Sequence, residues 1–117
     1  MSKEQLYIFD TTLRDGAQTQ GVDFSIDDKE KISSALDKLG VDYVEGGWPG
    51  ANPTDTEFFN KDHNFKTTKL TAFGMTKKSE HSAENDPMLS SLINSKSTSV
   101  CLFGKSWDFQ VDVALGI

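Results

Sequence analysis

The sequence predicts an α/β fold in which parallel strands alternate with helices, and three observations lead to this prediction. Short apolar runs alternate along the chain with longer segments of helical period. About 20 to 30 residues separate consecutive apolar runs, which is the length of a crossover helix with its loops. The chain has 117 residues, the usual size of one domain, and no change of composition marks a boundary within it.

Four apolar runs are predicted strands, with residue ranges 5–10, 42–46, 68–73 and 98–103. The first contains the continuous apolar run 6–9, which is typical of a buried strand. The second alternates, with Tyr43 and Glu45 on one face and Val44 on the other. Each of the last two runs is followed by a glycine, which ends the extended segment.

The first predicted helix spans residues 26–39. Ser25 precedes it and Asp28 follows three residues later, which is close to a capping box with Asp in place of Glu. Its apolar residues, among them Ile32 and Leu36, fall mostly on one face, with charged residues opposite. Gly40 is expected to end the helix.

Two further segments are predicted helices, over residues 54–60 and 86–94. The earlier one begins either at Asn52, which precedes a proline, or at a box formed by Thr54 and Glu57. The later one begins at Asp86, which also precedes a proline. The polar segment 77–86 before it is predicted to be a mobile loop.

The acidic charge of the chain excludes some classes of partner. It carries 12 Lys and Arg against 18 Asp and Glu, a formal net charge of −6. Nucleic-acid binding needs a basic face that releases counterions from phosphates, so no nucleic-acid partner is expected. No run of about 18 apolar residues occurs, so no membrane-spanning helix is expected. The segment 1–10 resembles neither a signal peptide nor a transit peptide, and we expect a cytoplasmic protein.

Few residues are available for disulfides or thiolate metal sites. The one cysteine, Cys101, excludes an internal disulfide and a four-thiolate zinc site. It lies within a predicted strand, and we predict that it is a small core residue. His63 and His81 lie in polar stretches, fit no metal-ligand spacing and are predicted to be surface residues.

Chemistry in parallel sheets is found at the carboxyl ends of the strands. The segment after the first strand holds the most distinctive pair, Arg14 and Asp15. The guanidinium favours the ionised form of the carboxylate beside it, which suits a hard divalent cation. Its planar fork of donors can hold a carboxylate or polarise a ketone oxygen. Gly16 permits the turn that directs both side chains inward, and the alternative is a solvated pair on a surface loop.

Glu45 is an unexpected carboxylate within a strand. It shares a face with Tyr43, and a buried carboxylate needs a partner. Arg14, at the end of the neighbouring strand, is the nearest candidate, and the alternative is a glutamate at the rim of the sheet. The segment 46–50 that follows is either a substrate lip with an aromatic wall or plain turn chemistry. It has neither the lysine of a phosphate-binding loop nor GxGxxG spacing, so no nucleotide site is predicted.

Three segments carry a resemblance to a known family. Residues 10–18 resemble the opening motif of the metal-dependent aldol and Claisen enzymes, which include isopropylmalate, homocitrate and citramalate synthases and hydroxymethylglutaryl-CoA lyase. Residues 40–53 and 103–108, together with Ala17, look most like the citramalate synthase branch. The resemblance implies a TIM barrel, of which residues 1–117 would form about the N-terminal half. That half holds roughly four strands, does not close the barrel and includes no complete second domain.

The resemblance also implies a role for four residues. Asp15 matches the carboxylate that ligates a divalent metal, which would be Mg, Mn or Zn. Arg14 matches the residue that binds the 2-oxo acid, polarises its carbonyl and steadies the enolate of acetyl-CoA. Glu45 matches the acid that positions Arg14, and Gln18 matches a substrate-binding polar residue of the first loop.

The activity that this resemblance implies is a Claisen condensation of acetyl-CoA with a 2-oxo acid. With pyruvate the product is citramalate, in branched-chain amino-acid biosynthesis. The family's other metal ligands lie in a His-x-His motif, which this sequence lacks, so the chain alone is expected to be inactive and to bind metal weakly or not at all. The open edges of a half-barrel lead us to expect a homo-oligomer. Two alternatives remain: a metal-dependent carbon–carbon lyase of the same family, and a non-catalytic, self-associating half-barrel.

Overall fold

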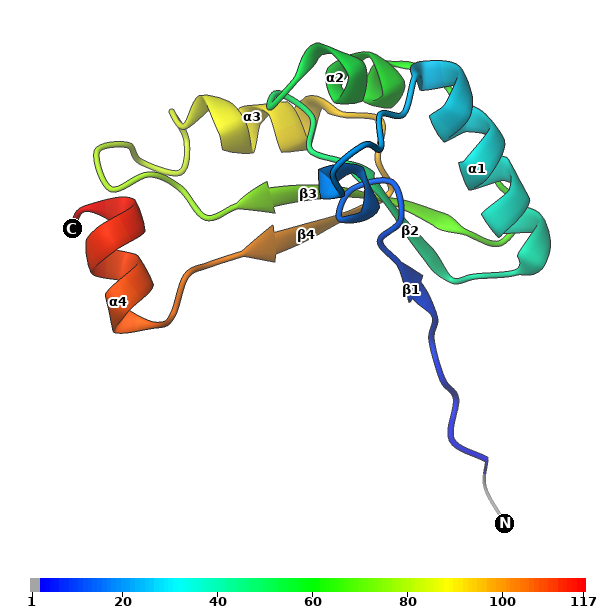
Figure 1. Cartoon of the computed structure of the whole chain (residues 1–117), viewed down its shortest axis with the longest axis horizontal. Helices are drawn as coiled ribbons and strands as arrows, with labels where there is room; N and C mark the ends of the chain where they lie inside the picture. Colours follow the sequence, from blue (N-terminus) through cyan, green and yellow to red (C-terminus); the bar gives the residue numbers. More distant parts are fainter. Residues whose placement is uncertain (1–2) are drawn as a thin grey trace.

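The structure is a computed structural model that describes residues 3–117. Its centre is a four-stranded sheet in which the strands follow one another in chain order and every neighbouring pair is parallel (Figure 1). The strands are β1 (Phe9–Asp10), β2 (Tyr43–Gly47), β3 (Lys69–Met75) and β4 (Ser99–Phe103). The predicted α/β class with a parallel sheet is therefore confirmed. This open run of parallel units is the arrangement found in part of a TIM barrel.

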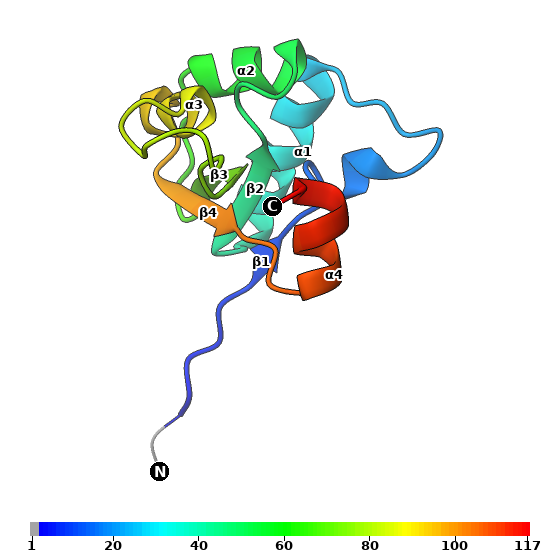
Figure 2. The ribbon, with the colours of Figure 1, turned by 90° about the vertical axis from the view of Figure 1, so that its left-hand side faces the viewer.

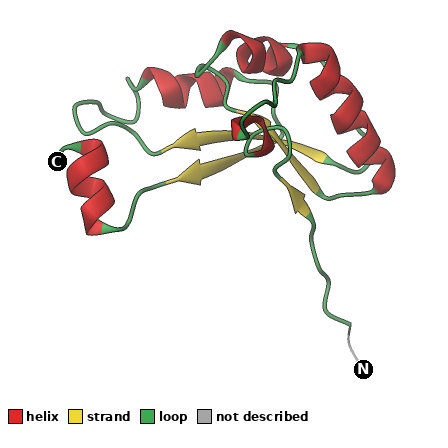
Figure 3. Ribbon diagram, viewed as in Figure 1, coloured by secondary structure: helices red, strands yellow, loops and turns green. Residues whose placement is uncertain are grey.

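Three helices connect the strands and lie on the same side of the sheet (Figures 1 and 3). They are α1 (Ile26–Leu39), α2 (Pro53–Asn60) and α3 (Pro87–Asn94), within a residue of the three predicted helices. After β4 the chain forms a further short helical segment that the sequence analysis missed, α4 (Asp108–Gln110) continued by the π-helical turn η2 (Val111–Leu115). No helix among residues 3–117 is long and apolar enough to cross a membrane.

The predicted start and end of α1 are confirmed by its capping contacts. The Ser25 hydroxyl accepts the Asp28 N–H at 3.1 Å, and the Asp28 carboxylate accepts the Ser25 N–H at 3.0 Å. This capping box satisfies two of the N–H groups that a helix start leaves unpaired. At the other end Gly40 adopts a left-handed conformation, with φ of 93°. Its N–H donates to the carbonyl oxygens of Asp37 and Leu36 in the last turn.

The contacts at the starts of α2 and α3 show which predicted residues cap these helices. Asn52 accepts the Asp55 N–H at 2.8 Å, so the helix begins with this residue and not with the alternative box further along. Asp86 accepts the N–H groups of Met88 and Leu89 at the start of α3. It also accepts the Lys78 N–H at 2.9 Å, and this backbone hydrogen bond is the main cause of its lowered pKa. The acidic cap thus fastens part of the preceding loop.

Two apolar clusters fill the space between the sheet and the helices. One cluster lies under α2 and α3 and comprises Phe58, Phe59, Leu70, Ala72 and Leu92. The other lies under α1 and comprises Leu13, Val41 and Val44. Because side chains alternate along a strand, the residues next to these face the opposite side of the sheet, which α1, α2 and α3 leave uncovered.

The first predicted strand is wrong in its length and its burial. Only Phe9–Asp10 forms strand structure, and Leu6 is 80% exposed. The physical reason is that β1 lies at the edge of the sheet with β2 as its neighbour, while the segment before it extends away from the sheet (Figure 2). Ile8 remains hydrogen-bonded to the fold. Its carbonyl accepts the N–H groups of Asp42 and Tyr43, and its own N–H donates to Asp42 Oδ2 at 2.7 Å.

Candidate functional site

Arg14 and Glu45 form an ion pair at the carboxyl end of the sheet. A tight turn after β1, in which Thr11 O accepts the N–H groups of Asp15 and Gly16, brings Arg14 over β2. There Arg14 Nε donates to Glu45 Oε1. The Glu45 side chain is 1% exposed and the Arg14 side chain 21% exposed. The pairing predicted from the sequence is confirmed, and the alternative of a glutamate at the rim is excluded.

Aromatic rings fix the plane of the guanidinium. The centre of the Arg14 guanidinium lies 4.2 Å from the ring centroid of Phe73, which belongs to β3. Trp48 in turn meets Phe73 edge-to-face, with ring centroids 5.4 Å apart. Among residues 3–117 the terminal Nη atoms of Arg14 donate no hydrogen bond. Its outer donors therefore remain available to a ligand, while Nε and the ring plane are held.

Asp15 and Gln18 lie on the solvent side of this pair. The Asp15 side chain is 62% exposed, and its Oδ1 is 3.6 Å from Arg14 Nη1, a weak surface contact. Gln18 is exposed in the short turn η1 (Gly16–Gln18). Asp15 offers one hard oxygen ligand for a cation. No group of three or more His, Cys, Asp or Glu able to hold a metal exists within the described part of the chain.

Cys101 lies on β4 beside the pair and is half-buried, so its predicted place in a core is only partly right. Burial is the main cause of the raised pKa of its thiol, and the Glu45 carboxylate raises that pKa further. Arg14 acts in the opposite direction. A raised pKa keeps the thiol protonated, which favours the predicted inert role over a nucleophilic one.

A second ion pair, which the sequence analysis missed, lies on the helix side of β2. Lys29 of α1 contacts Asp55 of α2, with Nζ 2.8 Å from Oδ1. The same ammonium donates to Leu13 O at 2.9 Å and to Gly46 O at 2.7 Å. The Lys29 side chain is only 3% exposed. Nothing in the sequence distinguishes this lysine from its charged neighbours on α1, because only the fold places it against β2.

The glycine-rich segment after Glu45 proves to be a turn with a packing constraint. Gly47 has a φ of 147°, and a Cβ placed on it would lie 2.5 Å from the Asp55 carboxyl carbon. The Trp48 N–H donates to Asp55 Oδ2 at 2.9 Å, so Asp55 fastens the turn. The Trp48 side chain also lines a cavity of about 380 Å³ at the carboxyl ends of β3 and β4, with Lys77 and Lys105 nearby. Turn chemistry is thus confirmed, and the substrate-lip reading stays a prediction.

The two histidines lie apart from Arg14. Both are half-buried, so the prediction that they are surface residues is only partly right. His63 Nε2 bonds to Phe58 O at 2.7 Å, and its ring lies between those of Phe58 and Phe65. Polar neighbours in the sequence concealed this aromatic cluster, which forms only when the segment folds back onto α2. His81 is half-buried in the loop before α3.

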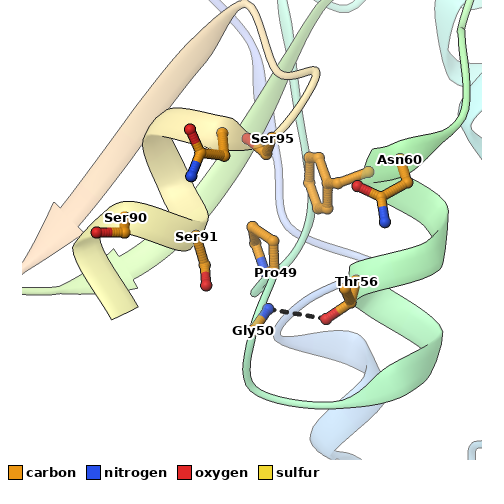
Figure 4. A pocket seen from close by; sticks show the side chains of 9 residues that line it. Pro49, Gly50, Thr56, Asn60, Ser90, Ser91 and Ser95 are labelled. Carbon is orange, nitrogen blue, oxygen red and sulfur yellow. Dashed lines mark hydrogen bonds between the residues drawn. The ribbon is translucent and has the colours of Figure 1, made fainter. Parts of the chain in front are cut away.

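A smaller cavity, of about 230 Å³, lies between α2 and α3 (Figure 4). Its lining includes Thr56, Asn60 and Ser91, and Gly50 N–H donates to Thr56 Oγ1 at 2.9 Å. None of the lining residues carries a charge. The lining therefore holds no carboxylate, histidine or lysine that could activate its hydroxyl groups.

Comparison with known proteins identifies the family of the chain. Residues 5–115 match the family described as HMGL-like. The (R)-citramalate synthase of Aquifex aeolicus is 52% identical over 114 residues, which cover 96% of this chain and 22% of that protein. That of Sulfolobus acidocaldarius is 47% identical over 119 residues, which cover 100% of this chain and 23% of that protein.

A second group of relatives shares a shorter stretch. The 2-isopropylmalate synthase of Microcystis aeruginosa is 48% identical over 60 residues, 51% of this chain and 11% of that protein. The chain spans about a fifth of the length of the citramalate synthases that it matches, with 22% and 23% of those proteins covered. The family match covers almost every residue, including the turn that carries Arg14 and the strand that carries Glu45. The chain belongs to the HMGL-like family.

Proposed function

We propose that this chain supplies part of the active site of an acyltransferase that condenses acetyl-CoA with a 2-oxo acid. Pyruvate is the proposed acceptor, because the relatives that match the whole chain are (R)-citramalate synthases. The observation that carries the proposal is the Arg14–Glu45 pair, which is buried on one side and keeps the outer donors of Arg14 free. A planar cation with free donors suits an acceptor that has a carboxylate and a neighbouring ketone.

Arg14 stabilises the charge that develops during carbon–carbon bond formation. The methyl carbon of acetyl-CoA loses a proton and attacks the carbonyl carbon of pyruvate, and the ketone oxygen becomes an alkoxide that takes up a proton. Water then cleaves the thioester, which releases CoA and leaves the dicarboxylic product. Donors held in place before the reaction stabilise such an oxyanion without reorganisation. Glu45 contributes by holding Nε, which leaves the terminal Nη atoms for the substrate. Gln18 is proposed to bind substrate from the same loop.

A divalent metal is proposed for the complete enzyme only. Asp15 would hold it as one ligand, and the metal would act as a Lewis acid toward the keto acid. The residues described here do not by themselves fit a metal, because Asp15 is a single exposed carboxylate and no group of three candidate ligands surrounds it within residues 3–117. Several ligands held in geometry are needed for tight binding. We therefore expect weak or no metal binding by this chain.

Residues 1–117 are proposed to form the N-terminal half of a catalytic barrel, with the proton acceptor and the other metal ligands in the remainder. A chimera tests this proposal, in which residues 1–117 replace the matching segment of the Aquifex aeolicus (R)-citramalate synthase. Thiol release is measured with acetyl-CoA and pyruvate. The chimera should release CoA only when pyruvate is present, and the 117-residue chain alone should release none.

Asp15→Asn in the chimera should abolish CoA release, because the carboxylate no longer offers an anionic ligand. Asp27→Asn is the matched control, since Asp27 is an exposed carboxylate that pairs only with Lys31 on the surface of α1. The proposal is wrong if the folded chimera is inactive, or if the chain alone releases CoA in an Asp15-dependent way. Cleavage of a hydroxyacyl-CoA without condensation would favour the lyase alternative.

Self-association is proposed as well, because apolar residues stay exposed on the edge strand β4. Val100 and Leu102 lie on the helix side of β4, where α3 does not cover them, and both are exposed. Open edges and uncovered apolar faces seek partners. A homo-oligomer in light scattering would support this part of the proposal, and a monodisperse monomer would contradict it. The cytoplasmic location stays a prediction.

A further inference from the structure

We propose that Lys29 is a positioning residue for the Arg14–Glu45 pair. The inference rests on the proposed function of that pair. Lys29, a buried residue of α1, would hold the backbone next to Arg14 and the backbone next to Glu45 in fixed positions. Lys29 makes no hydrogen bond or ion pair with the side chain of Arg14 or Glu45 among residues 3–117. It acts through the peptide carbonyls next to the two residues in the sequence.

The contacts of the ammonium connect the two halves of the pair. Leu13, whose carbonyl accepts one bond at 2.9 Å, directly precedes Arg14. Gly46, whose carbonyl accepts a second bond at 2.7 Å, directly follows Glu45. One buried cation therefore joins the turn that presents the guanidinium to the strand that presents the carboxylate.

The Leu13 side chain is anchored in the core under α1, but its peptide carbonyl depends on Lys29. The turn that carries Arg14 follows β1, which is a two-residue edge strand. Leu13 O accepts no backbone N–H among residues 3–117, so Lys29 is its donor. A buried carbonyl without a donor is costly, and the lysine both satisfies it and fixes its direction. Small rotations of this peptide would move Arg14 relative to Glu45.

Asp55 holds the lysine in place. Its Oδ1 lies 2.8 Å from the ammonium nitrogen. Its Oδ2 accepts hydrogen bonds from the backbone N–H of Trp48 and from Asn52 Nδ2. A buried ammonium is stable only with such a partner. The network thus runs from α1 through the ends of β1 and β2 to α2, and every donor of the ammonium is used.

The test follows the Arg14 Nε–H of the isotope-labelled 117-residue chain by NMR, since this proton lies in the hydrogen bond to Glu45. In the wild-type chain the signal should be resolved and exchange slowly with water. Lys29→Met keeps the length of the side chain and removes the ammonium, so the exchange should become faster by about tenfold or more. Lys31→Met is the matched control, because it breaks an exposed pair two residues along the same helix and should leave the signal unchanged.

A second variant separates positioning from loss of stability. Lys29→Met with Asp55→Asn removes both charges, so no unpaired carboxylate stays buried, while the new amide can still accept the Trp48 N–H. It should recover stability but retain the fast Arg14 exchange. Leu92→Ala, which destabilises the core under α3, should lower stability and leave the Arg14 exchange close to that of the wild type.

Wild-type exchange at Arg14 in the folded double variant would overturn the proposal. If neither lysine variant folds, the wild-type chain decides: a slowly exchanging Lys29 ammonium with nuclear Overhauser contacts to Leu13 and Gly46 supports it, and their absence overturns it. These measurements need no substrate. An inactive chimera would therefore count against the proposed function and not against the role of Lys29.

Discussion

Two buried ion pairs lie at the end of β2. They differ in how many of the N–H donors of each cation are used by the protein. Lys29 uses its three donors on Asp55 and on two peptide carbonyls. Arg14 uses Nε on Glu45 and keeps its outer donors unbonded within residues 3–117. A cation whose donors are all used can only hold the fold, whereas one with free donors can also hold a ligand. The difference separates a structural pair from the pair that we propose to bind substrate.

The two pairs also lie on opposite faces of the sheet. Lys29 and Asp55 come from α1 and α2, which cover one face, and their side chains are 3% and 12% exposed. Arg14 lies over the face without a helix, against Phe73. Charge on the covered face must be fully compensated, while charge on the other face is open to an incoming molecule.

The largest loss of stability is expected from Lys29→Met. It leaves the Asp55 carboxylate buried without a cation, which costs about 3–5 kcal/mol in pairs of this kind. Urea denaturation of the purified chain measures the free energy of unfolding. A loss below about 1 kcal/mol, the range of exposed pairs, would show that the lysine is not part of the scaffold.

Gly47→Ala should weaken the same pair from the other side. The new methyl group would meet the Asp55 carboxyl carbon at 2.5 Å, at a φ of 147° that side chains rarely adopt. Backbone strain of this kind costs about 1–3 kcal/mol. Gly21→Ala is the comparison, because its φ is also positive but nothing lies within 4 Å of the added carbon. Equal losses in both variants would mean that the contact with Asp55 adds nothing.

Asp37 sharpens the comparison, because this carboxylate is held by peptide N–H groups and not by a cation. The backbone N–H groups of Thr67, Lys66 and Thr68 lower its pKa well below the ordinary value of 3.8. A lowered folded-state pKa gives stability that is present above the ordinary value and is lost as pH falls toward the folded one. Asp37→Asn should therefore flatten the decline of stability below about pH 4. An unchanged decline would show that other carboxylates cause it.

The smallest effects are expected at the histidines, which belong to neither pair. His63→Ala removes a ring packed between two phenylalanines and should cost about 1 kcal/mol of stability, while His81→Ala should change it by less than about 0.5 kcal/mol. CoA release by the chimera should stay near that of the unsubstituted chimera in both variants. A large loss of CoA release in a stable variant would place a histidine in the site.

The sequence predicted the parts of this molecule that depend on local pattern. The helix over residues 26–39 was predicted to the residue, because a capping box and a terminal glycine mark its ends. The partner of Glu45 was predicted from the position of Arg14 at the end of a neighbouring parallel strand.

Several features that the sequence did not reveal depend on contacts distant in the chain. Lys29 looks like any other charge on a helix until α1 packs on β2. The apolar run 6–9 has the composition of a buried strand, yet its burial depends on neighbours that β1 lacks in this structure. Phe73 supports Arg14 only because three strands align their carboxyl ends.

The most direct test of the reactive role of Arg14 is CoA release by the chimera carrying Arg14→Lys. Lysine keeps a positive charge near Glu45, so the free energy of unfolding should change little, but it lacks the planar fork of donors that Arg14 presents. The account predicts that CoA release with acetyl-CoA and pyruvate falls by about 10²–10³-fold, as when one stabilising donor is lost from an oxyanion site. CoA release within about twofold of the unsubstituted chimera would contradict it, because the outer donors of Arg14 would then play no part in the reaction.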